Sequence, residues 1–593
     1  MRRRQFLYGL PGLTGLATVG PALPGIATPG AQAAPVAGEA HRAGPPTTTP
    51  EDIRFPAHSR PLRPGTAQEA GLLPEHVARI ADEAAALPDI PGFALIAVRD
   101  GVIVAHEARG HALRYASWDE ETATAVELPE DEWVPMSTDT LFDMASVTKL
   151  FTSTVAVQLS EQRVIDLDAP AADYLPEFAA TDPAKAAVTV RQFLVHRSGL
   201  VSWLNLYADL PDNEARLAAI YDSPLQREPG SGYEYSDLNL ITLGVLLERV
   251  TGDPLDALVA DRVTGPLGLT DTRFNPPSSL VSRIAATEYQ PWTGRGMIRG
   301  SVHDENAWAF GGVAGHAGIF STASDMAVFA QMLANGGHYA GTRVLAEDTV
   351  RAVLTNHNAD IGASPRGLGW QVDQRFFMDA LCSPVTAGHT GYTGTSVTVD
   401  PVSRMVFVLL TNRVHPTRER GTESVYRRRP ARAFARSLPV SSAPRRSAWF
   451  AGMTDATAAR LTVPAATGTT VGFDLWYDTE PENDTVTVEA ATDDAGTFRP
   501  VPLALRTRTG GHRWESDGTV HGYAARRWLR ATADLPPGTT RLRWTYRTDA
   551  DYLGRGVYVD RVRVLRDDAL VFDSERPSDA ALIVAEGWHD SEN

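Results

Sequence analysis

The sequence predicts a multidomain chain in which an α/β domain precedes an all-β sandwich. Residues 66–440 place β-rich runs toward both ends and helical patterns between them, which indicates an antiparallel sheet flanked by helices, with an additional helical region. Residues 447–575 instead show short runs of period two, separated by turn residues, with little helical pattern. A length of 593 residues is also too great for one ordinary hydrophobic core.

The α/β domain is expected to begin with a helix over 73–87 and to end with one over 424–438. Two β-rich runs, 93–98 and 102–105, flank Asp100-Gly101, a strong signal for a tight hairpin. A second hairpin is predicted over 393–399 and 405–410, and further helices are predicted after Ser146, Asp237 and Ser324.

The N-terminus predicts export. Arg2-Arg3-Arg4 precedes a modestly apolar stretch and the small-x-small run Ala31-Gln32-Ala33, so residues 1–33 are interpreted as a twin-arginine signal peptide rather than a disordered basic tail. Residues 34–65 are Pro/Thr/Ala-rich and predict a linker, and 576–593 predict a loose tail. No later run reaches the roughly 20 apolar residues of a membrane span. A secreted, extracytoplasmic protein without a transmembrane anchor is expected.

Composition excludes several classes of function. The formal net charge of −17 argues against nucleic acid as a partner. With Cys382 as the single cysteine, an intrachain disulfide and CxxC-type zinc or redox sites are excluded, and Cys382 is expected to be a small, partly buried hydrophobe. No cofactor and no metal are expected in the catalytic machinery.

Lysine is the rarest charged residue, present only as Lys149 and Lys185 among many arginines. Because a guanidinium cannot lose its proton near neutral pH, a retained lysine suggests a need for a deprotonatable amine. Lys149 completes Ser146-Val147-Thr148-Lys149, an S-x-x-K pattern that puts hydroxyl and amine on one helix face. A lysine whose pKa is lowered by burial can activate a serine. Ser146 is therefore the candidate nucleophile.

Two further motifs follow in order. Tyr235-Ser236-Asp237 leads into a helix; its tyrosine, with a pKa lowered by a nearby ammonium, could shuttle the serine proton, although a helix N-cap with a packing tyrosine is the alternative. Gly388-His389-Thr390-Gly391 precedes a strand and could engage a substrate carboxylate or acyl oxygen, although a plain loop histidine is the alternative. The ordered combination of S-x-x-K, Y-x-D and H-T-G is rarely produced by chance.

With these motifs, residues 66–440 resemble serine hydrolases of the class C β-lactamase and DD-peptidase type, which include penicillin-binding proteins and related esterases. The resemblance extends over His196-Arg197-Ser198-Gly199-Leu200, Pro229 to Ser236, Val302 to Ala307, Gly315 to Gly318 and Leu410 to Arg413.

The resemblance implies an acyl-enzyme at Ser146, with Lys149 and Tyr235 managing the proton. It also implies an oxyanion hole from the backbone N–H groups of Ser146 and Tyr392. The remaining implied substrate-binding residues are Asp237, His389, Thr390 and Gly391.

Two departures from the family pattern affect the substrate. Asp237 stands where Asn is more usual, and His389 stands where class C β-lactamases carry Lys. Both favour a DD-carboxypeptidase, D-amino-acid peptidase or esterase over a β-lactamase. The alternatives are a β-lactamase and a non-catalytic penicillin-binding-type receptor or polymer-binding protein. A small peptide or ester is the expected substrate, with cell-wall peptidoglycan as a candidate source.

Further interpretations concern the remaining histidine motifs and the C-terminal sandwich. His303-Asp304 and His316 could form a metal site or dyad, but bracing of loops near the pocket is preferred because no HExxH-type spacing is present. The C-terminal sandwich resembles jelly-roll modules of secreted bacterial hydrolases over Phe473 to Glu480, Tyr546 to Ala550 and Gly556 to Asp560. The resemblance implies a module that binds a surface glycan or polymer or that simply covers the enzyme. Calcium on Asp474, Asp549 or Asp560 is conceivable there, with solvated loop acids as the preferred interpretation.

Overall fold

The computed structural model describes residues 44–57, 61–87, 89–362, 364–420, 424–440, 447–492 and 496–591. The expected signal peptide, 1–33, lies outside the described residues, as do the first residues of the predicted linker. Within the described ranges, none of the helices has both the length and the apolar character that crossing a membrane requires.

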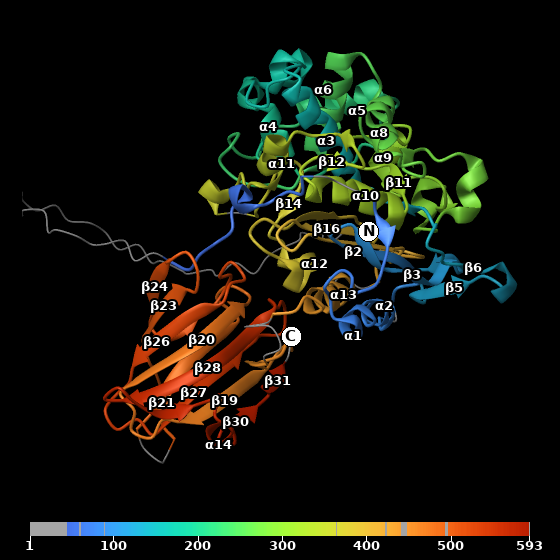
Figure 1. Ribbon diagram of the computed structural model, residues 1–593. Helices are drawn as coiled ribbons and strands as arrows, with labels where there is room; N and C mark the ends of the chain where they lie inside the picture. The colour runs from blue at the N-terminus through green and yellow to red at the C-terminus, as the bar shows by residue number, and fades with distance from the viewer. Residues whose placement is uncertain are drawn as a thin grey trace, which may run out of the picture. The chain divides into compact units, whose positions relative to one another are not determined.

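The α/β domain is built on one large sheet, as the sequence predicts (Figure 1). Its strands are antiparallel except for β1, which runs parallel to β3. In spatial order they are β1 (Arg63–Pro64), β3 (Val102–Leu113), β2 (Gly92–Arg99), β17 (Met405–Thr411), β16 (Ser396–Asp400), β15 (Ala387–Thr390) and β14 (Gln371–Val372), with β6 (Val134–Pro135) beside β3.

Both predicted hairpins form. At the first turn Asp100 and Gly101 adopt positive φ angles of 53° and 76°, the backbone conformation that a tight hairpin requires. The second hairpin joins β16 to β17 through Asp400-Pro401, and β17 then pairs with β2 over its full length. Strands from opposite ends of the domain thus become central neighbours, which explains why β-rich runs occur at both ends of the sequence.

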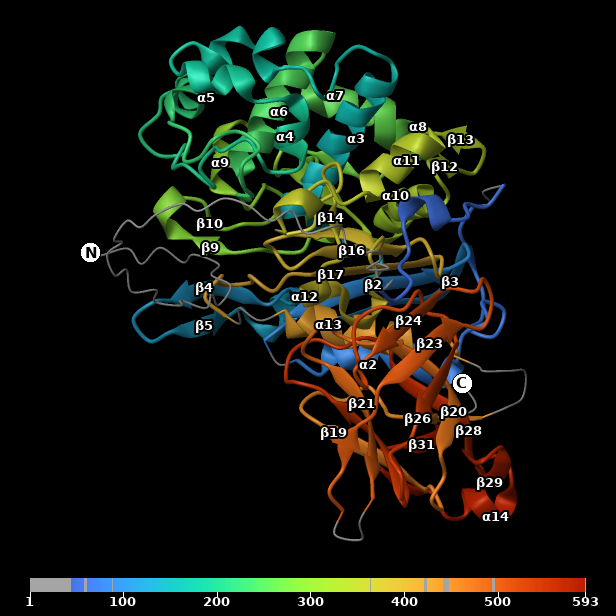
Figure 2. The same ribbon diagram turned by 90° about the vertical axis from the view of Figure 1, so that its left-hand side faces the viewer.

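Helices cover both faces of this sheet, as Figures 1 and 2 show. One face packs on α10 (Ala323–Ala334), beneath a larger helical region, and the opposite face packs on α2 (Ile80–Ala85) and α13 (Val425–Arg436). The remaining helices of the domain are α1 (Pro74–Val77), α3 (Thr148–Glu161), α4 (Val190–Leu194), α5 (Asn213–Asp222), α6 (Asp237–Thr251), α7 (Leu255–Val259), α8 (Gly265–Leu267), α9 (Glu305–Ala309), α11 (Glu347–Leu354) and α12 (Arg375–Met378).

Short strands connect these helices. They are β4 (Tyr115–Asp119), β5 (Thr124–Glu127), β7 (Phe142–Asp143), β8 (Arg273–Phe274), β9 (Tyr289–Gln290), β10 (Gly296–Met297), β11 (Ile319–Ser321), β12 (His338–Tyr339) and β13 (Thr342–Arg343). β7, β11 and β8 form a small sheet of their own, and β7 leads directly to Ser146.

The start of the domain differs from the prediction in two places. The helix expected over 73–87 is divided into α1 and α2. The predicted linker 34–65 ends in β1, whose residues Arg63 and Pro64 pair with Val102 and Ile103. Proline has no backbone N–H to donate to a neighbouring strand. An edge strand tolerates it, because one side of that strand's backbone has no neighbouring strand.

The C-terminal part is a two-sheet sandwich with a buried apolar core. One sheet contains β24 (Arg513–Ser516), β23 (Leu503–Thr507), β26 (Leu529–Asp534), β20 (Thr470–Asp478), β28 (Gly556–Arg566), β18 (Ala448–Phe450), β31 (His589–Ser591) and β29 (Ala569–Asp573). The other contains β22 (Arg499–Pro500), β21 (Thr485–Ala491), β27 (Arg541–Arg547), β19 (Ala458–Pro464), β30 (Val584–Glu586) and β25 (Thr519–Val520).

The tail predicted over 576–593 is wrong for most of its length. After the short helix α14 (Pro577–Ala580), β30 pairs with β19 and β31 pairs with β18, so the final described residues add a strand to each sheet. Trp588, between these strands, is buried in the sandwich core. Each of these strands is only three residues long, so their pairing depends on sheet edges that only the folded sandwich provides.

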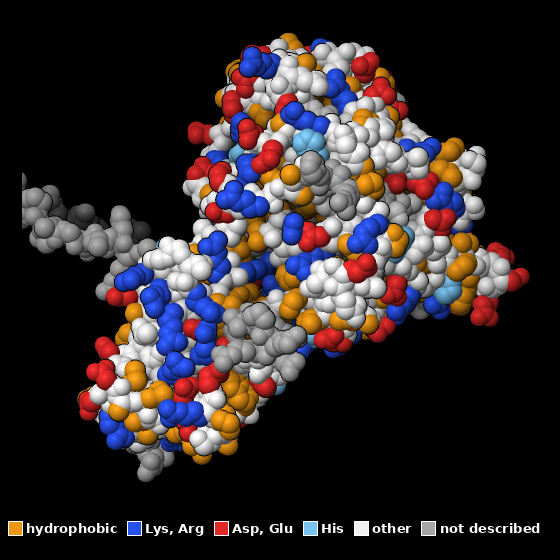
Figure 3. All heavy atoms as spheres, in the orientation of Figure 1, with side chains coloured by type: hydrophobic (Ala, Val, Ile, Leu, Met, Phe, Trp, Pro, Cys, Tyr) orange, Lys and Arg blue, Asp and Glu red, His pale blue; other side chains and the backbone are white. Residues whose placement is uncertain are grey.

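One sheet of the sandwich presents many arginines, although the chain as a whole is acidic. Figure 3 shows basic side chains gathered over the region where Figure 1 labels β23, β26 and β20. Arg506 of β23 and Arg530 of β26 are direct cross-strand neighbours. Three arginines, Arg508, Arg530 and Arg561, surround the buried Asp474, which neutralises only part of their charge. This arginine face is thus a local exception to the negative net charge.

Candidate active site

Ser146 lies at a sharp transition from strand to helix. β7 ends at Asp143, a 3-10 turn covers Ala145–Val147, and α3 begins at Thr148. Ala145 has a φ of 46°, unusual for a residue with a side chain, and its N–H donates to the Asp143 carboxylate at 2.8 Å. Ser146 is partly exposed although its neighbours on both sides are buried. The turn therefore presents this hydroxyl to solvent from an otherwise buried segment.

Lys149 lies beneath Ser146 and is fully buried. Its ammonium donates to Ser146 Oγ at 2.9 Å and to the His316 carbonyl oxygen at 3.3 Å. It also forms an ion pair with Asp237 at 2.8 Å between Nζ and Oδ1. The helical spacing places serine and lysine side by side, as predicted from the sequence, while the other two partners come from distant segments.

Tyr235 lies in the loop before α6 and is the third member of the group formed with Ser146 and Lys149. Its hydroxyl hydrogen-bonds with both Ser146 and Lys149. Lys149 Nζ lies 4.9 Å from the centre of the tyrosine ring. The three candidate catalytic residues therefore form one connected hydrogen-bonded group, with Asp237 attached through the lysine.

The pKa values of Lys149 and Tyr235 are shifted in the direction opposite to that expected from the sequence. Burial acts to lower the pKa of Lys149, but the Asp237 carboxylate and Tyr235 outweigh it, so the net pKa of the amine is raised. Burial raises the pKa of Tyr235, and this exceeds the opposite effect of the Lys149 ammonium. Depression of both pKa values, expected from the sequence, is therefore wrong because a buried lysine next to a carboxylate keeps its proton.

The position of Tyr235 is maintained by the His196 motif. The His196 ring centre lies 4.6 Å from that of Tyr235, and its Nδ1 accepts a hydrogen bond from the Ser236 N–H at 3.1 Å. Ser236 occupies the N-cap position of α6, yet its hydroxyl donates to the Val201 carbonyl at 2.6 Å instead of capping the helix. The purely local N-cap interpretation is thus insufficient, because the serine connects two loops that hold the tyrosine.

The H-T-G motif ends β15 next to this group. His389 is buried, and its ring centre lies 6.3 Å from that of Tyr235. Burial, aided by the charges of Arg366 and Lys149, lowers the pKa of His389 well below its usual value. The imidazole is therefore neutral near neutral pH. It supplies no positive charge at this position.

Gly391 is required for the approach of β15 to the serine turn. A Cβ there would lie 2.4 Å from the Met144 carbonyl oxygen and 2.1 Å from Thr395 Oγ1, so any side chain would force the two segments apart. Thr390 is partly exposed, and Tyr392 is exposed with its ring stacked on His303. The structure thus brings all eight predicted site residues into one region around Ser146.

Sequence reasoning missed Arg366. Its guanidinium is buried, lies 5.2 Å from the centre of the Tyr235 ring and donates to the Tyr233 hydroxyl at 2.7 Å. Its Nε and Nη1 atoms are buried and have no hydrogen-bond partner among the described residues. A second positive charge therefore lies behind Tyr235 and His389. No motif marks this loop arginine, because it reaches the site only through tertiary packing.

The other histidines have a bracing arrangement, in agreement with the preferred interpretation. His303 pairs with Glu288 at 2.9 Å rather than with the adjacent Asp304. His316 pairs with Asp304 at 2.9 Å, while its own carbonyl accepts from Lys149. These pairs fix the loops on one side of the site and orient the carbonyl that contacts the lysine.

The second lysine, Lys185, has a structural role. It is fully buried and donates to the Ile220 and Tyr221 carbonyls at the end of α5, at 3.4 and 2.5 Å. Substitution Lys185→Met is expected to lower the free energy of unfolding by about 1–3 kcal/mol, because it leaves buried carbonyls without their donor. Chemical denaturation measures this loss, and kcat of the folded fraction should equal that of the native chain. A selective loss of kcat would contradict the structural assignment.

Comparison with known proteins identifies the family of the α/β domain. The β-lactamase family model matches residues 77–431. A protein of Escherichia coli K12, provisionally named D-alanyl-D-alanine carboxypeptidase, is 36% identical over 354 residues, covering 55% of this chain and 79% of its own length.

Two solved structures each align with about three fifths of the chain. The hydrolase EstCE1, described as having promiscuous acyltransferase activity, is 23% identical with a TM-score of 0.48 and covers 62% of this chain and 99% of its own. A β-lactamase/D-alanine carboxypeptidase from Yersinia pestis, solved with citrate, is 19% identical with a TM-score of 0.48, covering 63% of this chain and 100% of its own. Since the family model spans more than half of the sequence, this chain belongs to the β-lactamase family of serine hydrolases.

Proposed function

We propose that this chain is an exported hydrolase that forms an acyl-enzyme at Ser146 and acts on peptides ending in a D-amino acid or on related esters. The observation that carries the proposal is the 2.9 Å hydrogen bond between Lys149 Nζ and Ser146 Oγ, inside a group that also contains Tyr235. A serine hydroxyl needs such a base to become a nucleophile near neutral pH. The 36% identical relative named D-alanyl-D-alanine carboxypeptidase supports the peptide substrate.

The proposed acylation step begins when Ser146 Oγ attacks the substrate carbonyl carbon. Its proton passes to Lys149, directly or through the Tyr235 hydroxyl, and is then delivered to the leaving amine or alcohol as the scissile bond breaks. Water attacks the ester in a second step and releases the acyl group. Because Lys149 is charged in its resting pair with Asp237, the reactive state is the minority form that has released this proton.

Stabilisation of the transition state is assigned to backbone groups. The N–H groups of Ser146 and Tyr392 are proposed to bind the developing oxyanion, where fixed donors are most effective. Thr390 and His389 are proposed to contact the carboxylate or acyl end of the substrate. Arg366 supplies a long-range positive potential from behind them, since His389 itself is neutral. Peptides with a free carboxylate are accordingly preferred over neutral esters.

The two alternatives are judged from the same residues. The β-lactamase alternative is less favoured because His389, where class C enzymes carry a lysine, adds no positive charge, and Asp237, where Asn is more usual, adds a negative one. A non-catalytic receptor is less favoured because the connected group of Ser146, Lys149 and Tyr235 is intact. The discriminating experiment incubates the purified chain with muropeptides, nitrocefin and short-chain esters and follows the products by mass spectrometry. Release of one D-alanine or turnover of the esters supports the proposal, with faster turnover expected for the muropeptides, whereas turnover of nitrocefin alone overturns it.

A change in pH dependence is expected for Asp237→Asn. The Asp237 carboxylate raises the pKa of Lys149 and of Tyr235, so its neutralisation should lower both. A larger fraction of the amine is then deprotonated at any given pH, and the acidic limb of the kcat/KM profile should move to lower pH. The apparent pKa read from this limb belongs to the interacting group of Lys149, Tyr235 and Asp237 as a whole, not to one residue.

Two control variants accompany Asp237→Asn. Asp237→Glu keeps the charge and should retain the native limb, and Asp253→Asn removes an exposed carboxylate beyond the end of α6 and should leave the profile unchanged. A limb that stays in place in Asp237→Asn, or moves to higher pH, contradicts the assignment of the lysine as the group that must lose its proton.

We further propose that the C-terminal sandwich holds the enzyme near an anionic polymer of the cell surface. The arginine face over β23, β26 and β20 supports this partner, because its positive charge is exposed on an otherwise acidic chain. Binding to such a polymer should weaken as salt concentration rises. Co-sedimentation with cell walls, compared between the native chain and Arg506→Glu, tests the proposal. Equal binding by both contradicts it.

A further inference from the structure

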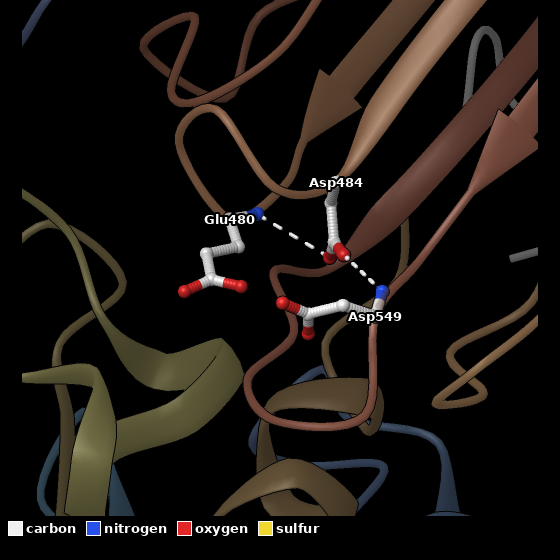
Figure 4. A group of neighbouring side chains, drawn as sticks. All are labelled: Glu480, Asp484 and Asp549. Atoms are coloured by element: carbon white, nitrogen blue, oxygen red, sulfur yellow. Dashed lines mark hydrogen bonds between the residues drawn. The ribbon is translucent and has the colours of Figure 1, made fainter. Parts of the chain in front are cut away.

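Three carboxylates meet at one end of the β-sandwich, far in sequence from the serine site. Glu480 follows β20, Asp484 precedes β21 and Asp549 follows β27. β21 and β27 pair with Thr485 opposite Arg547, so the start of one strand lies against the end of the other. One oxygen from each carboxylate lies within 4.8 Å of the other two. Figure 4 shows the three carboxylates directed toward a common space.

The cluster is largely enclosed by protein. Asp484 is fully buried, and Glu480 is only 7% exposed. Asp484 is fixed by backbone donors, accepting from the Asp549 N–H at 3.2 Å and the Glu480 N–H at 3.5 Å. These contacts hold the loop after β20 and the exit of β27 in one arrangement, so the positions of the carboxylates do not depend on flexible side chains alone.

One of the buried oxygens has no partner. Glu480 Oε2 is buried and receives no hydrogen bond from any described residue, although its side chain points into the cluster (Figure 4). Buried polar atoms are rarely left unsatisfied, because the lost hydration is not replaced. This oxygen therefore points to a ligand that supplies the missing positive or donating group.

The local electrostatics agree with this requirement. Burial, together with the neighbouring Asp549, raises the pKa of Glu480 to about 7, and burial raises the pKa of Asp484 to about 7. A side-chain hydrogen bond with Asn483, and to a lesser extent the charge of Arg375, act in the opposite direction on Glu480 without removing the shift. Three close carboxylates thus repel one another, and a bound cation would relieve the repulsion that protons otherwise relieve.

We propose that Glu480, Asp484 and Asp549 bind a calcium ion that joins the β20–β21 turn to the end of β27. The donors are all oxygen, which suits a hard cation rather than zinc. Calcium accepts oxygen ligands in a flexible geometry, whereas magnesium requires a tight octahedral set and usually keeps several waters. Asp549 is partly exposed, so ion entry and water ligands are available on its side.

The proposed site differs from the acids singled out in the sequence. Of Asp474, Asp549 and Asp560, only Asp549 belongs to it. Asp474 is instead enclosed by arginines, which makes it unsuitable for a cation. Glu480 and Asp484 were not distinguishable from solvated turn acids, because their burial depends on the pairing of β21 with β27. The proposal is independent of the reaction at Ser146.

Calcium titration of the full chain tests the proposal. After removal of divalent ions with a chelator, thermal unfolding is followed with added CaCl2 and, separately, MgCl2. Calcium at about 100 times its Kd is expected to raise the melting temperature of the sandwich by about 5 °C or more, with a smaller effect of magnesium. Terbium emission excited through tyrosine gives a second readout, because the buried Tyr546 contacts Asp484.

Two variants make the result specific. Asp549→Asn removes a partly exposed ligand and is expected to reduce calcium affinity at least tenfold while keeping the native fold in the absence of the ion. Glu482→Gln removes one negative charge from the same turn, outside the cluster, and should leave calcium affinity unchanged. Absence of any calcium effect in the native chain, or an equal loss in Asp549→Asn and Glu482→Gln, overturns the proposal.

Discussion

Substitution Ser146→Ala is expected to lower kcat/KM by about 10⁴-fold or more, because it removes the atom that forms the acyl-enzyme. The serine is partly exposed, and its described hydrogen bonds are to Lys149 and Tyr235, so the fold should persist. Intact-protein mass spectrometry after treatment with a fluorophosphonate should show one adduct on the native chain and none on the variant.

Ser153→Ala is the matched control for this experiment. Ser153 lies on the same helix, α3, and its buried hydroxyl has no hydrogen-bond partner among the described residues. Its removal should leave both kcat/KM and the adduct unchanged. Retention of the adduct by Ser146→Ala, or turnover near the native rate, would show that another residue is the nucleophile.

Substitution Lys149→Arg is expected to lower kcat/KM by about 10²- to 10⁴-fold. Arginine keeps a positive charge opposite Asp237, but it cannot release a proton near neutral pH and so cannot act as the base. Pre-steady-state kinetics should place the loss in acylation of Ser146, with substrate binding less affected. An acylation rate within a few-fold of the native value would contradict the role of this lysine.

The effect of Lys149 on stability can be separated from its effect on catalysis. Lys149→Met leaves the Asp237 carboxylate without its cation and should destabilise the fold by about 3–5 kcal/mol, as expected when one partner of a buried ion pair is removed. The double variant Lys149→Met/Asp237→Asn should recover much of this stability while remaining inactive. Recovery of activity in the double variant would mean that the lysine acts only by balancing charge.

Much of the fold could be predicted from the sequence because the relevant signals are local. The turn at Asp100-Gly101 and the alternation of the sandwich strands each depend on residues close together in the chain. The same holds for Ser146 and Lys149, since one helical turn suffices to bring them together. Family resemblance added Tyr235 and His389, which no local rule connects to the serine.

The C-terminal strands and the position of Arg366 could not be predicted, because they depend on contacts between distant segments. The final strands β30 and β31 are three residues each and pair with the edges of a folded sandwich, so no periodic pattern marks them in the sequence. Arg366 affects the site only after its loop packs on Tyr233 and Tyr235.

The sequence by itself determined that this chain carries a serine–lysine pair on one helix, within an α/β domain followed by a β-sandwich. Only the tertiary structure decided the charge of that pair, because the pKa of Lys149 depends on burial and on Asp237, a residue of another helix. The carboxylate cluster of the sandwich likewise depends on residues that are brought together only by the tertiary structure. A proton or an ion is held by the summed field of groups brought together in space, and spacing along a chain does not encode that field.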